Sequence, residues 1–192
     1  MRAKIFFLTA LFFTYFSAFS QDIGSLKTEV TKIYKATASM DYDGIFETTY
    51  PKVFDIIPKE TMKEMFQQMM SNDDYNIKLI PVEPNFSFGE IKKIGTQTFC
   101  LIDHDNVMQM KFKKPIIDKD AETMIGIFKK SMDAKEVTFD KDKNEFTIKL
   151  RSTLIGVYDD STSNKWKFLN KDKENQLFNM IFDENVKTAL GL

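Results

Sequence analysis

The sequence predicts an α+β fold, in which N-terminal helices pack on a curved antiparallel sheet and a further helix ends the chain. Apolar residues recur every three or four positions near both ends of the folded part, which is the period of helices. They alternate with polar residues through the middle, which is the period of strands. Helices and strands are grouped along the chain, and such grouping is typical of antiparallel α+β folds rather than doubly wound parallel ones.

Three helices are expected at the N-terminal end. Asp22 can cap the first helix. Its apolar face comprises Leu26, Val30, Ile33, Thr37 and Met40. Asp41 can cap a short second helix through Phe46, and Pro58 fits the first turn of a third helix over residues 59–70. The apolar face of the third helix, which we expect in the core, comprises Met62, Met65, Phe66, Met69 and Met70.

Strand-like alternation then predicts three strands, over residues 76–82, 85–94 and 96–113. Gly89-Glu90 suggests a bulge within the second strand, and Gly95 suggests a turn after it. Because the outer face of these strands is polar, we expect a bent sheet with helices on one side only.

A fourth helix and three more strands follow. Asp118 is the expected cap of this helix. Its apolar side comprises Met124, Ile127, Phe128 and Met132. The later strands are expected over residues 136–139, 146–158 and 165–169, and a single C-terminal helix should stop at Gly191. The broad apolar face of that last helix comprises Leu177, Phe178, Ile181, Phe182, Val186, Ala189 and Leu190.

The run from Cys100 to Met108 allows two interpretations. Asp and Asn favour turns, so Asp103 to Asn106 could form a hairpin turn with His104 exposed. Alternatively the strand continues, because its alternation keeps the same phase across these residues. The strand would then present one largely apolar face made of Thr98, Cys100, Ile102, His104, Asn106, Met108, Met110 and Phe112. His104 and Asn106 would in that case lie inside a cavity rich in Met and Phe.

The N-terminus is typical of a secretory signal peptide. Arg2 and Lys4 give a positive start, the apolar run Ile5–Phe19 is too short for a spanning helix, and Ala18-Phe19-Ser20 is a small-x-small cleavage site. We therefore expect residues 1–20 to be removed and residues 21–192 to form one domain without a membrane span. The chain would be exported by a bacterium to the periplasm or the exterior. Its single cysteine cannot form an internal disulfide.

The charge balance argues against nucleic acid as a partner. The chain has 27 basic and 28 acidic residues, for a net charge of −1. Nucleic-acid capture requires a basic face. Beyond residue 20, Arg151 is the only arginine, and alternation places it on the outer face of its strand beside Lys149, where a solvated pair is expected. The seven glycines form no phosphate-binding loop motif.

A metal site or cofactor is not expected from this sequence. Zinc sites usually require several Cys and His ligands, and this chain has one of each. Asp103, Asp105 and Asn106 lack the Gly and the distal Glu of a calcium-binding loop.

Two stretches resemble the NTF2-like (cystatin-like cone) superfamily. The first lies between Val30 and Met70 and includes Ile33-Tyr34-Lys35-Ala36, Met40-Asp41-Tyr42-Asp43-Gly44-Ile45-Phe46 and Tyr50-Pro51. The second is Lys165-Trp166-Lys167-Phe168-Leu169, which is similar to the last strand of that fold. The resemblance implies helices packed on a conical sheet. It also implies either an isomerase or dehydratase or a non-catalytic binding module.

We expect an exported, non-catalytic module that binds an apolar small molecule or a protein partner in or around its cone. The pocket would be lined by Cys100, Asn106, Met108, Met65 and Met69. One alternative is a cone-type isomerase or dehydratase with His104 as its acid/base. Another is a protein-interaction module that uses the C-terminal helix as an exposed apolar surface.

Overall fold

The computed structural model describes residues 23–192 and has the expected α+β class. The expected signal peptide, residues 1–20, and the expected cap Asp22 lie outside the described residues. The helices span residues 23–39, α2 (Tyr42–Thr48), α3 (Val53–Ile56), α4 (Lys59–Met70), α5 (Asp118–Ser131), the 3-10 turn η1 (Asp160–Thr162), α6 (Gln176–Ile181) and α7 (Glu184–Leu190). The strands are β1 (Tyr75–Ile80), β2 (Ser87–Phe88), β3 (Lys92–Ile94), β4 (Gln97–Phe112), β5 (Glu136–Asp140), β6 (Glu145–Tyr158) and β7 (Lys167–Asn170).

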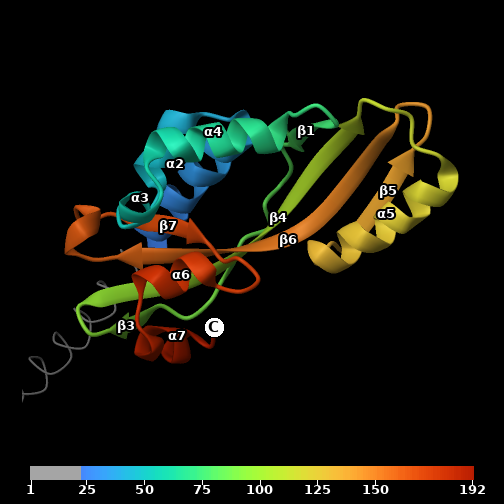
Figure 1. Cartoon of the computed structure of the whole chain (residues 1–192). Coiled ribbons are helices and arrows are strands. Elements are labelled where there is room, and N and C mark those ends of the chain that lie inside the picture. The colour runs from blue at the N-terminus through green and yellow to red at the C-terminus, as the bar shows by residue number, and fades with distance from the viewer. Residues whose placement is uncertain (1–22) are drawn as a thin grey trace, which may run out of the picture.

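A long antiparallel pair, β4 with β6, joins two lobes (Figure 1). Its register runs from Thr98 opposite Tyr158 to Lys111 opposite Glu145. At one end β1 pairs with β4 and β5 pairs with β6, and with α5 they form the small lobe. At the other end β2 and β3 pair with β4 and β7 pairs with β6. These strands form the large lobe with the helix over residues 23–39, α2, α3, α6 and α7.

In the large lobe helices cover both faces of the sheet, which corrects the expectation of helices on one side only. Cys100 and Leu154 pack on the side of the helix over residues 23–39. Phe99 and Ile155, their neighbours along the same strands, pack on the side of α6 and α7. Both faces of β4 and β6 are therefore apolar here, so alternation with polar residues is lost.

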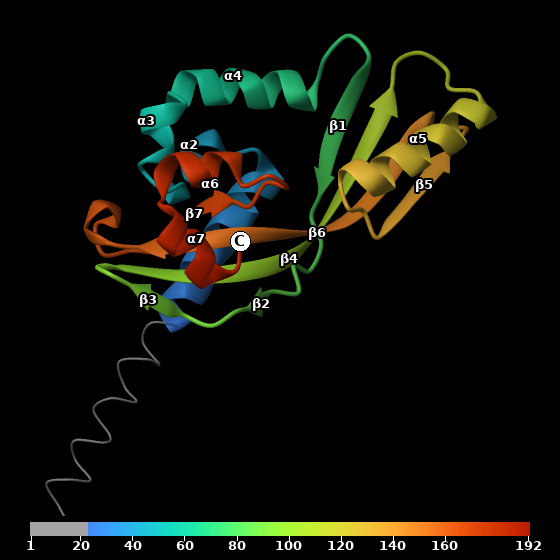
Figure 2. The same ribbon diagram turned by 60° about the horizontal axis from the view of Figure 1, so that its bottom comes forward.

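In the small lobe α5 covers one face of the sheet, and Phe146 of β6 is the centre of the core. The ring of Phe146 is buried and makes edge or tilted contacts with Phe112, Phe128 and Phe139 at centroid distances of 5.7, 5.3 and 4.6 Å. Figure 2 shows α5 lying along β5 and apart from the helices of the large lobe.

The expected C-terminal helix is two helices, α6 and α7. The helix breaks at Phe182–Asp183 because Asp183 acts as a new N-cap, and its carboxylate accepts a hydrogen bond from the Val186 amide at 3.0 Å. Gly191 ends α7 in the left-handed conformation that the sequence predicts, with φ of 71°. The break turns the chain so that both short helices bury their apolar sides against the sheet.

Two other helices differ from expectation in what they bury. α4 has the predicted bounds, but it contains no buried residue, and the exposed fractions of Met65 and Met69 are 54% and 49%. The expectation of a core methionine stripe is wrong for these two residues, because within residues 23–192 no element covers that side of α4. In α5, Asp118 makes no capping hydrogen bond, and Ile127 is exposed while Ala121 is buried.

Smaller differences concern the first helices and the second strand. The helix over residues 23–39 buries Ala36 where Thr37 was expected, and α2 continues past Phe46 to Thr48. The strand expected over residues 85–94 is divided into β2 and β3 at Gly89-Glu90. The Gly89 amide still donates to the Leu101 carbonyl at 2.8 Å.

A buried polar network fixes α2 and α3 to the end of β6. The Tyr50 hydroxyl, on a fully buried side chain, donates to Asp159 Oδ2 at 2.7 Å. Gln97 Nε2 donates to the same oxygen at 2.7 Å, and the Ser161 amide and hydroxyl donate to Asp159 Oδ1. Burial alone would raise the pKa of Asp159, but the hydrogen bonds from Ser161, Gln97 and Tyr50 hold this pKa below its ordinary value. Burial and the bond to Asp159 raise the pKa of Tyr50 to about 12.

Removing this hydroxyl should destabilise the fold. We expect Tyr50→Phe to lower the free energy of unfolding by about 2 kcal/mol, because a hydrogen bond to a charged group is lost at a buried site. Urea unfolding measures the change. Tyr42→Phe is the matched control, since Tyr42 lies half-buried on α2 and its hydroxyl should contribute little. Equal effects of the two substitutions would contradict the role of the network.

Candidate functional site

β4 runs unbroken through Asp103–Asn106, which confirms the continuous-strand interpretation. The turn-forming side chains are held in the strand by partners from other elements. Asp103 Oδ1 accepts from the Thr153 hydroxyl, directly opposite on β6, at 2.6 Å. Asp105 Oδ1 accepts from Arg151 Nη1, its opposite residue, at 2.9 Å. Cross-strand pairing thus outweighs the local turn preference.

His104 points inward beneath the aromatic rings of the large lobe. Its exposed fraction is 6%, and Asn106 Nδ2 lies 3.1 Å from its Nε2. With the Asn106 amide donating, Nε2 is the acceptor and the neutral ring carries its proton on Nδ1. The rings of Tyr34 and Phe86 pack against the imidazole at centroid distances of 5.9 and 6.1 Å. Within residues 23–192, Nδ1 of His104 makes no hydrogen bond.

The surroundings of His104 favour its neutral form. Burial is the largest cause and lowers its pKa below the ordinary value of 6.5, and the positive charge of Arg151 lowers it further. The Ile102 carbonyl and the carboxylates of Asp103 and Asp105 oppose this shift without reversing it.

A segment over residues 82–87 closes the sheet above His104. The Tyr34 hydroxyl donates to the Val82 carbonyl at 2.9 Å, and the Asp105 amide donates to the Pro84 carbonyl at 2.7 Å. Arg151 Nη2 donates to the Ser87 hydroxyl at 2.7 Å and thus holds the segment to β6. Arg151 is therefore a clamp and not the solvated residue expected from its strand position.

Asn85 and the Arg151 clamp together give Asp105 a low pKa. A hydrogen bond from Asn85 and the interaction with Arg151 lower this pKa to about 2, so Asp105 stays ionised at neutral pH.

An acid/base group must lie within hydrogen-bond reach of the reacting atom. The imidazole of His104 is covered by the rings of Tyr34 and Phe86 and is not exposed to the Phe46 side of the molecule.

The expected pocket residues are distributed over three parts of the molecule. Cys100 is fully buried under the helix over residues 23–39, and Met108 packs in the core of the small lobe. Asn106 contacts His104, so these two residues are brought together as expected. Met65 and Met69 lie exposed on α4.

The expected apolar face of the C-terminal helices is largely buried, although Met180 on α6 and Ala189 on α7 are exposed. Its large side chains Phe178, Phe182, Val186 and Leu190 are buried against the sheet. These four side chains of the expected apolar face are therefore covered by the chain itself.

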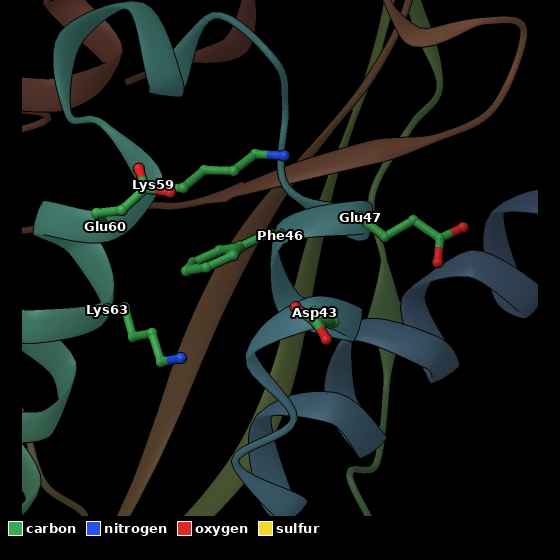
Figure 3. Close-up of a pocket in the computed structure, with 6 residues that line it drawn as sticks. All are labelled: Asp43, Phe46, Glu47, Lys59, Glu60 and Lys63. Carbon is green, nitrogen blue, oxygen red and sulfur yellow. The ribbon is translucent and has the colours of Figure 1, made fainter.

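An open cleft lies between α2 and α4, and it is lined by Phe46 and Phe54, two members of an aromatic row. The row consists of Tyr42, Phe46 and Phe54, with the Phe46 ring 6.4 Å from Tyr42 and 5.8 Å from Phe54 between centroids. Figure 3 shows Phe46 reaching from α2 toward α4, between the side chains of Lys59 and Lys63. On this side of Phe46 the cleft has a volume of about 460 Å³.

The cleft continues on the other side of Phe46, where its volume is about 390 Å³. This part is bounded by η1 and β7. Its lining residues are Phe46, Glu47, Thr49, Pro51, Phe54, Lys59, Ser161, Thr162, Ser163, Lys165 and Lys167. Segments separated by more than a hundred residues thus meet at one ring, and we call the whole feature the Phe46 cleft.

Two lysines from α4 lie over the aromatic row. Lys59 Nζ is 4.9 Å from the Phe54 centroid, and Lys63 Nζ is 5.4 Å from the Tyr42 centroid. Both residues are on one face of α4 because they are four positions apart. Such cation–π contacts are worth about 0.5–1 kcal/mol at exposed sites, so a ligand can replace them at little cost.

The aromatic row was not recognised in the sequence. Its signal is the pair of four-residue spacings, Tyr42 to Phe46 and Lys59 to Lys63. Each spacing identifies only a helix face. The path of the chain through α3 brings the aromatic face of α2 opposite the lysine face of α4 across a cleft.

Among residues 23–192, no cluster of three or more His, Cys, Asp or Glu side chains is placed to hold a metal ion. In the same part of the chain, no helix combines the length and apolar character needed to cross a bilayer.

The buried neutral His104 should make stability depend on pH. Because its folded-state pKa is lowered, the unfolded chain takes up more protons as the pH falls through about 6.5, and the free energy of unfolding should decrease between about pH 7 and pH 5. His104→Gln should flatten this dependence, since the chain has no other histidine. Urea unfolding at a series of pH values measures it. A wild-type chain that gains stability on acidification over this range would contradict the prediction.

No family model, curated protein or solved structure matches this chain, so the interpretation of the Phe46 cleft depends on its own geometry.

Proposed function

We propose that this protein is a non-catalytic binding module that holds the aromatic part of a small molecule in the Phe46 cleft. The observation that carries the proposal is the aromatic row of Tyr42, Phe46 and Phe54, which faces α4 across an open cleft. Ligand sites are typically concave, with apolar and aromatic walls and a few polar groups that orient the ligand.

The geometry of the row suits a flat ligand. Phe46 stands edge-on to Phe54, with an interplanar angle of 85°, so a planar ring can stack on one and meet the edge of the other. The exposed side chains of Met65 and Met69 continue along α4 beyond the cleft. Methionine side chains adapt to irregular apolar shapes, so α4 can adjust to ligands of different outline.

The state of the chain's single histidine supports a non-catalytic role. His104 is neutral, buried and covered, and it lies in the sheet rather than in the Phe46 cleft. The buried dyad of Tyr50 and Asp159 is also enclosed, and its hydrogen bonds anchor α3 to β6.

We also propose that this chain has the fold of an NTF2-like cone and that it is exported from a bacterial cell. A long helix packed on a bent antiparallel sheet supports the cone, as does the position of the resembling residues Tyr50, Trp166 and Phe168 in the core. The charged start and short apolar run of residues 1–20 support export.

A neutral aromatic probe tests the binding site. N-phenyl-1-naphthylamine should bind the full chain with a rise in fluorescence, and Phe46→Ala should weaken binding by about tenfold, because the largest aromatic contact is lost. Ile127→Ala is the control, since it removes an exposed apolar side chain on α5, away from the cleft. Unchanged affinity in Phe46→Ala, with urea unfolding like that of the wild type, would refute this site.

The mass of the secreted protein tests export. Expressed in a bacterial host, the chain should be recovered outside the cytoplasm with Gln21 as its first residue. Replacing Ala18 and Ser20 by leucine should block cleavage, because a signal peptidase requires small residues at these positions. Recovery of the uncleaved wild-type chain in the cytoplasm would contradict the export proposal.

A further inference from the structure

We infer that the ligand of the Phe46 cleft is an organic monoanion, an aromatic carboxylate or sulfonate, whose charged group lies against Lys59, Lys165 and Lys167. This inference rests on the proposed function and adds the chemical class and the orientation of the ligand. The evidence for this inference is the arrangement of charged side chains around Phe46.

The two sides of Phe46 differ in charge. The side that faces η1 and β7 is lined by three lysines and by one acid, Glu47. On the other side Asp43, Glu47 and Glu60 outnumber Lys59 and Lys63. An anionic group is therefore attracted to the β7 side, and the aromatic body of the ligand extends over Phe46 and Phe54.

Within residues 23–192, the three lysines of the β7 side make no ion pair with a carboxylate, as is also the case for most other lysines there. In residues 23–192, the lysines paired with a carboxylate within 4.0 Å are Lys32, Lys135, Lys141, Lys143, Lys149 and Lys187. None of these lysines lines the cleft. The β7 side of the cleft thus groups three ammonium groups, none of which lies within 4.0 Å of a carboxylate of the described residues.

Lys167 is positioned to hold an anion. Its ammonium group donates to the Glu47 carbonyl at the C-terminal end of α2, which fixes its direction and leaves two N–H donors. Burial is the main cause that lowers the pKa of Lys167; the carboxylates of Glu47 and Glu29 oppose this shift, and the like charges of Lys165 and Lys32 add to it. A bound anion would relieve the repulsion between Lys165 and Lys167.

Hydroxyl groups from η1 and the turn after it complete the anionic end of the cleft. Ser161 and Ser163 are exposed and line the same side as Lys165. The Ser161 hydroxyl donates to Asp159, so its oxygen remains an acceptor, whereas the Ser163 hydroxyl can donate to an anion. Because lysines act as point charges without the planar fork of arginine, this end suits a single charge better than a bidentate phosphate.

Two probes that differ by one sulfonate test the inference. 1-Anilinonaphthalene-8-sulfonate has the skeleton of N-phenyl-1-naphthylamine with an added negative charge. The full chain should bind the sulfonate at least about fivefold more tightly at low ionic strength, and added salt should reduce only the affinity for the sulfonate. Fluorescence titration measures both affinities under the same conditions.

Lysine variants locate the charged end. Lys59→Gln combined with Lys165→Gln should weaken sulfonate binding about fivefold more than it weakens binding of the neutral probe, because only the sulfonate carries a charge. Lys78→Gln with Lys119→Gln is the control, because it removes the same charge from exposed residues of the small lobe. Lys167 is kept, since it also caps α2.

The outcomes separate this inference from the proposed function. Equal affinity for the two probes, or equal sulfonate losses in the two double variants, would overturn the anionic class while leaving the aromatic cleft in place. If neither probe binds, or Phe46→Ala binds both as the wild type does, the proposed function fails and the inference fails with it.

Discussion

The antiparallel pairing of β4 with β6 is the constraint on which the rest of the structure depends. Fourteen residue pairs join the two strands, and both lobes share them. Neither lobe has a complete sheet of its own, because β1 and β5 flank one end of the pair while β2, β3 and β7 flank the other. A change in register by one residue would exchange the two faces of β4, so that Cys100 and Ile102 would leave their places beneath the helix over residues 23–39 and the charged side chains of Asp103 and Asp105 would turn to that side.

Polar side chains of the β4–β6 pair hold neighbouring segments of the chain against the sheet. The pairs Asp103–Thr153 and Asp105–Arg151 keep β4 extended where its local composition favours a turn, and the Arg151 clamp draws the segment over residues 82–87 across the sheet. His104 is enclosed as a result, so the chain's only imidazole becomes part of the core. At the far end of β6, the hydrogen bonds of Asp159 hold Tyr50 in place, and the chain leaving Tyr50 leads into α3 and α4. The buried network thus sets the position of the helices that enclose the Phe46 cleft.

The cleft combines an aromatic row with a charge gradient, and the two have different origins. The row comes from α2 and α3, which follow each other in the chain. The excess of lysine on one side comes from Lys59 of α4, from Lys167 of β7 and from Lys165 just before β7. Arginine is nearly absent from the chain, so recognition here depends on the location of positive charge rather than on directional hydrogen-bond forks. This arrangement favours a ligand with a flat apolar body and one negative end.

The sequence by itself determined the α+β class, the positions of α4, β4, β5 and β6 and the helix stop at Gly191, because these depend on local periodicity and on backbone preferences. It also indicated that His104 and Asn106 share a strand face, since the phase of alternation survives in the structure. Only the tertiary structure decided that Asp183 divides the last helix, that both faces of the large lobe are covered and that Met65 and Met69 remain exposed. The Phe46 cleft belongs to this second group. Periodicity shows which side of an element is apolar, but which elements meet depends on contacts between residues far apart in the chain, and no local pattern contains them.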